Sequence, residues 1–353
     1  MAAVGHKRRG RERLTRVGFG GWSKMSREPT TANQSFPLVS TCGSKSRTHC
    51  GVPMRLFTLV PLATACAPTD VDAFLAALPD ERLLVSMPTA SPTLRVGEPS
   101  ETHAVTAEVS GSMNLLIETV LAGVQGVTAF DPTWTDDAHT QVQWGPWSDD
   151  GVDGRLFAVD EGAGTYTWGI DAKPTGADDE AWVTIVAGES TPSPDGELGT
   201  GTFALDFDAI GTVDAAELAT GQFVTTYDST AGTTTVSAIL VGFTEDGSSE
   251  PADAAYDWEQ TDAGGTMDLA LLADAGVGPY PELIVLRSRW STTGEGRGDA
   301  LVTGGDLGAL VVTTTDCWDA SFSTTYWEDN ATLTAEGDSA SCAFPTAQFD
   351  PDF

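Results

Sequence analysis

Apolar and polar residues alternate along the chain from about residue 140, which is the pattern of a half-buried β-strand. Clear examples are Tyr166–Ile170, Phe203–Phe207 and Met267–Leu271, where every second side chain is apolar. Clusters of Asp, Gly, Ser and Thr separate these runs at intervals of roughly eight to fifteen residues, as turns do. The pattern predicts about a dozen strands that are joined directly by hairpins, and therefore an antiparallel meander.

A sheet of this size does not stay flat, so we expect a mainly β fold, a large curved antiparallel meander that forms a half-barrel or a barrel-like structure. Apolar residues at helical spacing precede the strands. They predict a short helix over 70–78, ended by Pro79, and a second helix over 112–124 that packs against the concave side of the sheet. The polar segment 86–103 contains three prolines and is predicted to be a tether or loop.

Charge divides the chain into two parts. The full sequence has 18 Lys and Arg against 51 Asp and Glu, a net charge of −33. The first 65 residues have eleven basic and two acidic residues, so they are basic, whereas the rest of the chain is strongly acidic. The acidic part argues against nucleic acid as a partner. We expect residues 1–53 to be a disordered or wrongly annotated basic leader; a nucleic-acid-binding arm or a transit peptide are the alternatives.

The segment 54–65 has the layout of a secretory signal peptide, with one Arg, an apolar stretch from Leu56 to Leu62 and small residues after it. The sequence Leu62-Ala-Thr-Ala-Cys66 resembles the bacterial lipobox, although Ala63 stands where that motif prefers Leu. The resemblance implies that the mature chain begins at Cys66 and carries lipid there. We therefore expect an exported lipoprotein of the bacterial cell envelope, anchored to the outer membrane by lipid only. The alternative is that Cys66 is an ordinary residue in an apolar segment.

These boundaries predict a tether with a short helix over 66–110, followed by a domain of one helix and antiparallel strands over 111–353. Of the five cysteines, Cys42 and Cys50 lie in the leader and Cys66 is the predicted lipidation site. Cys317 and Cys342 remain, and in an oxidising compartment they are expected to form a disulfide. Two free buried thiols are the alternative.

Candidate catalytic residues are scarce. After Cys66 the chain has only His103 and His139, and it lacks the Gly-x-Ser-x-Gly and His-Glu-x-x-His motifs. We expect both histidines to be solvated in loops and predict no catalytic residue.

Two groups of charged residues are candidate binding sites. Asp149, Asp153 and Asp160 partly match the spacing of a calcium-binding loop; the alternative is a hairpin turn in an acidic protein. No other cofactor is expected. Arg287 and Arg289 lie two residues apart and therefore on the same face of a strand. Facing inward, they would need carboxylate partners or an anionic ligand; facing outward, they would form surface salt bridges.

Three short sequences resemble acidic envelope lipoproteins of the myxobacterial type, which have no assigned activity: Trp144-Gly-Pro-Trp147, Arg287-Ser-Arg-Trp290 and Cys317-Trp-Asp-Ala-Ser-Phe322. The order of elements is also similar to that of half-barrel carriers of bacterial lipoproteins. These resemblances imply a non-catalytic envelope lipoprotein that binds an apolar or amphiphilic ligand or acts as a scaffold. A secreted hydrolase with a carboxylate pair and a calcium-stabilised adhesion module are the alternatives.

Overall fold

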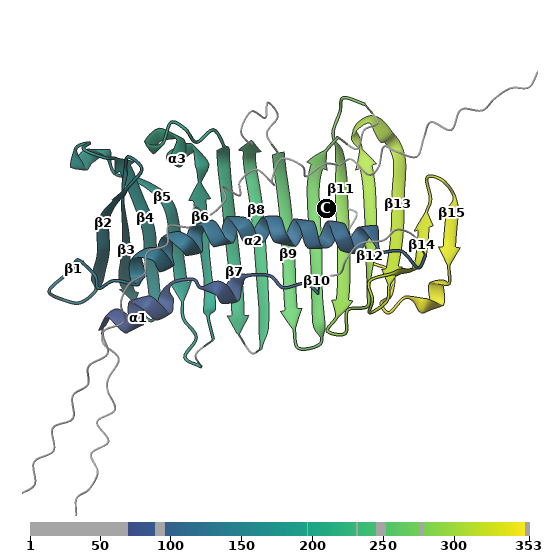
Figure 1. Ribbon diagram of the computed structural model, residues 1–353, viewed down its shortest axis with the longest axis horizontal. Coiled ribbons are helices and arrows are strands. Elements are labelled where there is room, and N and C mark those ends of the chain that lie inside the picture. The colour runs from purple at the N-terminus through teal and green to yellow at the C-terminus, as the bar shows by residue number, and fades with distance from the viewer. Residues whose placement is uncertain are drawn as a thin grey trace, which may run out of the picture.

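The computed structural model describes residues 70–88, 96–195, 197–230, 232–244, 252–274 and 278–349. In this part of the chain fifteen strands form one sheet, and every strand pairs antiparallel with the next strand in sequence (Figure 1). The two ends of the sheet do not pair, so the sheet is not closed. The predicted fold class, a mainly β antiparallel meander with N-terminal helices, is confirmed.

The elements that build this sheet and its cover have the following bounds. The strands are β1 (Trp134–Thr135), β2 (Gln141–Asp149), β3 (Val152–Gly162), β4 (Thr165–Pro174), β5 (Val183–Thr191), β6 (Gly199–Asp206), β7 (Thr220–Thr230), β8 (Thr233–Thr244), β9 (Ala252–Thr261), β10 (Gly264–Ala273), β11 (Glu282–Ser291), β12 (Gly296–Gly304), β13 (Gly308–Trp318), β14 (Thr324–Asp329) and β15 (Thr334–Gly337). The α-helices are α1 (Asp70–Ala77), α2 (Glu101–Thr128) and α3 (Phe207–Val213). Short 3-10 turns are η3 (Glu81–Leu83), η4 (Asp179–Ala181), η5 (Gly305–Leu307) and η6 (Ser339–Ser341).

Helix α2 lies across one face of the sheet, nearly at right angles to the strands, and reaches from β12 and β13 to β2 (Figure 1). We call the face under α2 the inner face and the opposite one the outer face. The apolar stripe of α2 is buried against aromatic side chains of the inner face. The largest of these are Trp144, Trp168, Trp318, Tyr227, Tyr256, Phe203 and Phe223, all 2% exposed or less. The hydrophobic core is thus one layer between the helices and the sheet.

Helix α1 agrees with the predicted helix over 70–78, but α2 begins at Glu101 rather than at Ser112. Ser100 caps α2, because its hydroxyl accepts a hydrogen bond from the backbone N–H of His103. In the first turns of α2 three of the four buried side chains are polar, His103, Thr106 and Ser110, and Val109 is the apolar one. The continuous apolar stripe is therefore too short at this end to reveal the start of the helix, and the sequence pattern places the start too late. The prediction of a loop is wrong for 101–103, and the predicted domain boundary at 110/111 falls inside the helix.

Several aromatic rings of the inner face lie over a glycine of the neighbouring strand. Trp168 pairs across β4 and β5 with Gly188, and a Cβ atom at Gly188 would overlap the Trp168 indole. Trp318 lies over Gly296 of β12 in the same way. Further pairs of this kind are Gly265 with Trp290, Gly201 with Tyr227 and Gly154 with Trp147. These glycines make room for flat indole and phenol rings, so many large side chains fit into a single layer.

Candidate functional site

A pocket of about 460 Å³ lies between the C-terminal half of α2 and strand β2. This volume falls within the range of small-molecule sites. Its walls are mainly apolar, and Asp131 contributes a carboxyl group. The residues that line it are Ala122, Gly123, Gly126, Val127, Phe130, Asp131, Thr133, Trp144, Gly145 and Trp147.

The two tryptophans of this pocket face the same side because of an irregularity in β2. Trp144 pairs with Leu156 and Trp147 with Gly154, so β2 has one more residue than β3 between these pairs. Such a bulge turns the strand by one position and brings side chains that are three residues apart to one face. Trp144 also donates from Nε1 to the carbonyl oxygen of Phe130, at 3.1 Å, which ties β2 to the chain that leaves α2.

Two glycines of α2 shape the helix side of the pocket: Gly126 leaves open space, and Gly123 lets the helix approach Ile170 closely. A Cβ atom at Gly126 would have no atom within 4 Å, and one at Gly123 would lie 3.0 Å from Cδ1 of Ile170. The sequence pattern predicts a helix that ends at 124, whereas α2 continues to Thr128, and the pattern does not predict this pocket. Two glycines spaced three residues apart at the end of an apolar helix were the signal that could have revealed it.

Arg287 and Arg289 lie on the outer face. Ser288, which stands between them, contacts Thr106 of α2 through their hydroxyl groups at 2.6 Å, so the flanking arginines point away from α2. Nε of Arg287 lies 3.4 Å from Oδ2 of Asp268, and Nη2 of Arg289 lies 3.7 Å from Oδ2 of Asp299. The arginines thus have carboxylate partners on the outer face and do not line the pocket under α2.

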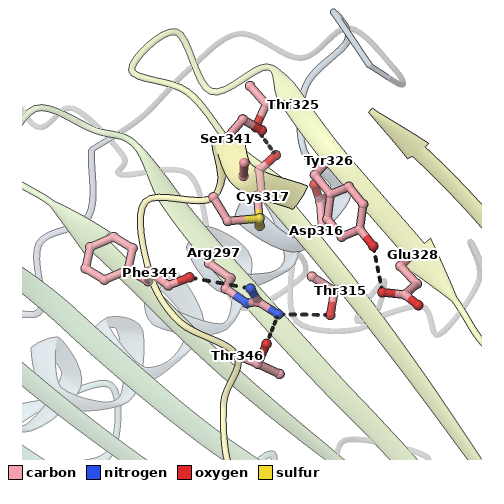
Figure 2. The surroundings of a disulfide bond; sticks show 12 residues. Arg297, Thr315, Asp316, Cys317, Thr325, Tyr326, Glu328, Ser341, Phe344 and Thr346 are labelled. Atoms are coloured by element: carbon pink, nitrogen blue, oxygen red, sulfur yellow. Dashed lines mark hydrogen bonds between the residues drawn. A yellow bond between two sulfur atoms is a disulfide. The ribbon is translucent and has the colours of Figure 1, made fainter. Parts of the chain in front are cut away.

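The last described segment, 343–349, covers part of this outer face (Figure 2). The guanidinium of Arg297 donates to both oxygens of Asp299 at 2.8–3.0 Å, to Oγ1 of Thr346 at 2.9 Å and to the carbonyl oxygen of Phe344 at 3.4 Å. Asp299, only 1% exposed, also accepts from the backbone N–H of Ala347 at 2.9 Å. Burial raises the pKa of Asp299, but the hydrogen bonds from Arg297, Thr315 and Ala347 outweigh it and hold the pKa below its ordinary value.

The predicted disulfide between Cys317 and Cys342 is confirmed, with an S–S distance of 2.06 Å. It links β13 to the chain that precedes segment 343–349, and it lies beside Arg297 in Figure 2. The covalent link and the Arg297–Asp299 pair together hold the C-terminal segment on the sheet.

The aspartates of the predicted calcium site are not brought together. Asp149 and Asp153 flank the turn between β2 and β3, and Asp153 accepts hydrogen bonds from Ser148 and Thr175. Asp160 lies near the other end of β3, seven residues from Asp153 in the sequence, about 23 Å in an extended strand. Within the described residues, no group of three or more His, Cys, Asp or Glu side chains could hold a metal ion. The calcium-loop spacing therefore reflects two separate parts of one hairpin.

His103 is 5% exposed, so the prediction of a solvated loop histidine is wrong for this residue. Its Nε2 lies 2.9 Å from the carbonyl oxygen of Pro88, and its ring packs on Phe322 with centroids 4.6 Å apart. Burial lowers the pKa of His103, so the imidazole is neutral. His139, in contrast, is exposed in the turn before β2.

Ser100, His103 and Asp316 are the residue types of a hydrolytic triad, and they lie close together at the start of α2. The hydroxyl of Ser100 donates to Oδ2 of Asp316 at 2.6 Å and accepts from the backbone N–H of His103. The imidazole of His103 faces Pro88 and Phe322 instead, and Ser100 is fully buried. A triad needs the serine hydroxyl on the imidazole, so this arrangement caps a helix and does not activate a nucleophile.

The predicted leader, signal peptide and lipidation site at Cys66 lie outside the described residues, as do Cys42 and Cys50. None of the helices in the described ranges is both long and apolar enough to cross a membrane. Comparison with protein-family models, with curated proteins and with solved structures finds no match to this chain.

Proposed function

We propose that this protein is an exported, non-catalytic lipoprotein of the bacterial envelope that binds an apolar or amphiphilic ligand in the pocket between α2 and β2. The observation that supports this most strongly is the pocket itself, which two tryptophans, Phe130 and Val127 line together with the glycine side of α2. Apolar surface of this kind gains about 25 cal/mol for each Å² that a ligand removes from water.

The position of the pocket limits the ligand. Helix α2 crosses the inner face from β12 and β13 to β2 and packs on its apolar side chains, so the ligand would bind at the end of the helix rather than along the whole inner face. Asp131 is exposed and lies among the lining residues, next to Phe130. An amphiphile whose head group donates hydrogen bonds, such as a hydroxyl or an amine, would place that group at Asp131 and its apolar part against Trp144 and Trp147.

Export is supported by two independent features. Segment 54–65 has the layout of a signal peptide before Cys66, and the Cys317–Cys342 disulfide is typical of proteins that meet an oxidising compartment. The intact mass of the protein extracted from its native membrane tests this part, because acylation at Cys66 and loss of residues 1–65 both change the mass. An unacylated chain that begins at Met1 would contradict it.

Ligand binding can be tested by filling the pocket from the helix side. Gly126→Leu adds a side chain where a Cβ meets no neighbour, and the leucine would occupy the cavity. The matched control is Gly111→Leu, an exposed glycine of the same helix that also has no neighbour within 4 Å and lies outside the pocket. Both variants remove a helical glycine, so both should stabilise α2 by about 0.5–1 kcal/mol.

The readout is the fluorescence of N-phenyl-1-naphthylamine, an apolar probe, titrated with the full chain. We expect the wild type and Gly111→Leu to bind with the same affinity and Gly126→Leu to bind at least about tenfold more weakly. Equal affinity in all three proteins, or no binding to the wild type, would contradict the proposed site.

A further inference from the structure

A second pocket, of about 270 Å³, lies on the outer face at the β1 end of the sheet. Arg155 and Phe157 of β3 line it, and they alternate with Leu156, which is buried on the inner face beside Trp144. This pocket therefore opens on the opposite side of β2 from the pocket proposed for apolar ligands.

Aromatic side chains form one wall and part of the floor. Trp134 is 50% exposed and pairs with Gln143 across β1 and β2, and Gln143 in turn pairs with Phe157. The ring of Phe157 lies over Gly169, where an added Cβ atom would be 2.7 Å from its Cζ. The three side chains form one cross-strand row, so their spacing is set by the sheet.

The polar end of the pocket is an arginine–aspartate pair that its neighbours hold in place. Nε and Nη2 of Arg155 lie 2.9 and 2.8 Å from Oδ2 of Asp171. Oδ1 of Asp171 accepts from the hydroxyl of Thr184 at 2.7 Å, and the guanidinium lies 4.5 Å from the ring centre of Trp182. Asp171 is only 6% exposed, whereas 31% of the Arg155 side chain is exposed. The pair is thus rigid, neutral as a unit and accessible on the arginine side.

The short strand that presents Trp134 is also fixed. Asp136 follows it and accepts hydrogen bonds from the backbone N–H of Gln141 at 2.7 Å and from the hydroxyl of Thr140 at 3.1 Å. Before it, the backbone N–H of Thr133 donates to the carbonyl oxygen of Gln143 at 2.9 Å. Hydrogen bonds on both sides of β1 therefore fix the backbone from which the Trp134 side chain extends.

We propose that this outer-face pocket binds a neutral saccharide. Aromatic rings offer apolar surface to the C–H faces of a sugar ring, and the amides of Gln141 and Gln143 can each donate and accept hydrogen bonds to hydroxyl groups. The planar guanidinium of Arg155 can bridge two neighbouring hydroxyls. Its charge is balanced by Asp171, and the acidic chain repels anions, so the site favours a neutral ligand over a phosphorylated or sulfated one.

The test is saturation-transfer NMR with the full chain and three neutral oligosaccharides: maltotriose, cellotriose and the trimer of N-acetylglucosamine. We expect at least one of them to receive magnetisation from the protein, and Trp134→Ala to weaken its binding at least about tenfold. Trp134→Phe keeps a ring and should retain part of the affinity. The matched control is Leu310→Ala, which truncates an exposed side chain of β13 at the other end of the sheet and should bind as the wild type does.

Thermal unfolding of each variant shows whether it is folded, and Gln143→Ala tests the same row without touching the edge strand. If none of the three oligosaccharides binds, or if Trp134→Ala and Gln143→Ala both bind like the wild type, the proposal is wrong. Tighter binding of glucose 6-phosphate than of glucose would overturn the preference for a neutral ligand. The pocket between α2 and β2 is tested separately with the apolar probe. A variant that loses saccharide binding can therefore still bind that probe, and the two proposals can fail independently.

Discussion

Two buried aspartates on neighbouring strands show how strongly the surroundings of a residue decide its chemistry. Asp299 of β12 faces outward and is surrounded by Arg297, Thr315 and the N–H of Ala347. Asp316 of β13 faces inward at the start of α2 and accepts hydrogen bonds from Ser100, Thr324 and the N–H of Thr102. Burial raises the pKa of Asp316 more than these hydrogen bonds lower it, whereas the pKa of Asp299 is lowered.

The contribution of Asp316 to the stability of the fold should therefore decrease as the pH rises. The pKa of the Asp316 carboxyl is raised in the folded protein. In the unfolded chain the pKa of an aspartate is about 3.9, so the folded state binds the carboxyl proton more tightly than the unfolded state does. The stabilising contribution of Asp316 is complete below the unfolded pKa and is lost as the pH rises through the folded pKa. We expect the unfolding free energy of the wild type, minus that of Asp316→Asn, to fall as the pH rises. Urea unfolding at a series of pH values measures this difference.

Asp299→Asn is the control with the opposite sign. The pKa of Asp299 is lowered in the folded state, so its contribution is present above the unfolded pKa and is lost as the pH falls through the folded pKa. The wild-type advantage over Asp299→Asn should thus shrink toward acid pH. The two stability differences, wild type minus Asp316→Asn and wild type minus Asp299→Asn, should thus change in opposite directions with pH. If they change in the same direction, the surroundings of the two carboxyl groups do not shift their pKa values in opposite directions.

At the scale of elements, the pairing of aromatic residues with glycines is the rule that shapes the core. Gly188 of β5 lies under the indole of Trp168, and an alanine there would push a methyl group into the ring. We expect Gly188→Ala to destabilise the protein by about 1–3 kcal/mol through overpacking, in spite of the better strand propensity of alanine. Chemical unfolding with tryptophan fluorescence measures this loss.

The control for this prediction is Gly111→Ala in α2, where no atom lies within 4 Å of the new Cβ. That variant should be stabilised by about 0.5–1 kcal/mol, since alanine is the better helix former. A Gly188→Ala protein as stable as the wild type would show that Trp168 can move aside, and the core would then be less tightly packed than its geometry indicates.

The elements that the sequence predicts well are those whose pattern is local. Alternation around Tyr166–Ile170 and Met267–Leu271 marks strands because the signal depends only on neighbours two residues apart. The start of α2 could not be predicted from local periodicity. His103 and Thr106 are buried against partners that are distant in the sequence, and the partner of Thr106 is Ser288. A polar residue in the core can be recognised only when its partner is known.

The candidate sites follow the same division. The Cys317–Cys342 disulfide could be predicted because elimination left a single pair of cysteines. Gly123 and Gly126 are a sequence signal for the pocket beside α2, but the residues that face them depend on the bulge in β2. The second pocket depends on the hairpin of β1, and both features join residues through register rather than through spacing. The face of Arg287 also depends on which side α2 covers, and strand alternation alone leaves that choice open.

The C-terminal segment is an element that depends on one covalent bond. The disulfide closes a loop between residues 25 apart in the sequence, and the chain-entropy model assigns about 3 kcal/mol to such a loop. We expect Cys342→Ser to lower the unfolding free energy by about 2–4 kcal/mol. It should also speed hydrogen exchange of the Ala347 backbone N–H, because only non-covalent contacts, such as those of Arg297, Arg287 and Asp299, would then hold the segment.

Reduction of the wild-type disulfide should reproduce the effect of Cys342→Ser on both measurements. Ser341→Ala is the neighbouring control, since it removes an exposed hydroxyl that donates to Asp338 and leaves the disulfide intact. Unchanged hydrogen exchange at Ala347 in Cys342→Ser would mean that the hydrogen bonds to Arg297 and Asp299 are sufficient to hold the segment.

At the scale of the whole molecule, the described residues form an open sheet with α2 on its inner face. An antiparallel sheet tolerates this arrangement because only one face needs to be apolar. The two edge strands, β1 and β15, are only two and four residues long, so they offer few free backbone groups to another chain. The sheet can therefore remain open without extending itself by pairing with a second copy.

Charge acts on the molecule as a whole, because the 51 acidic residues outnumber the 18 basic residues and leave a net charge of −33. Negative charges spread over one chain repel each other, and the folded state holds them closer together than the unfolded state does. Salt shortens the range of this repulsion from about 30 Å at 0.01 M to about 10 Å at 0.1 M. We therefore expect added salt to stabilise the fold.

Thermal unfolding in NaCl between about 0.01 and 0.1 M tests this prediction, since these concentrations change screening far more than they change the hydrophobic effect. A gain of about 1 kcal/mol would raise Tm by about 2–4 °C for a domain of this size. The Arg297–Asp299 pair is buried and therefore shielded from salt, so weakening of this pair should not cancel the gain. If Tm instead falls over this range, attraction between exposed charges outweighs repulsion, and the acidic surface must contain more compensating contacts than its composition indicates.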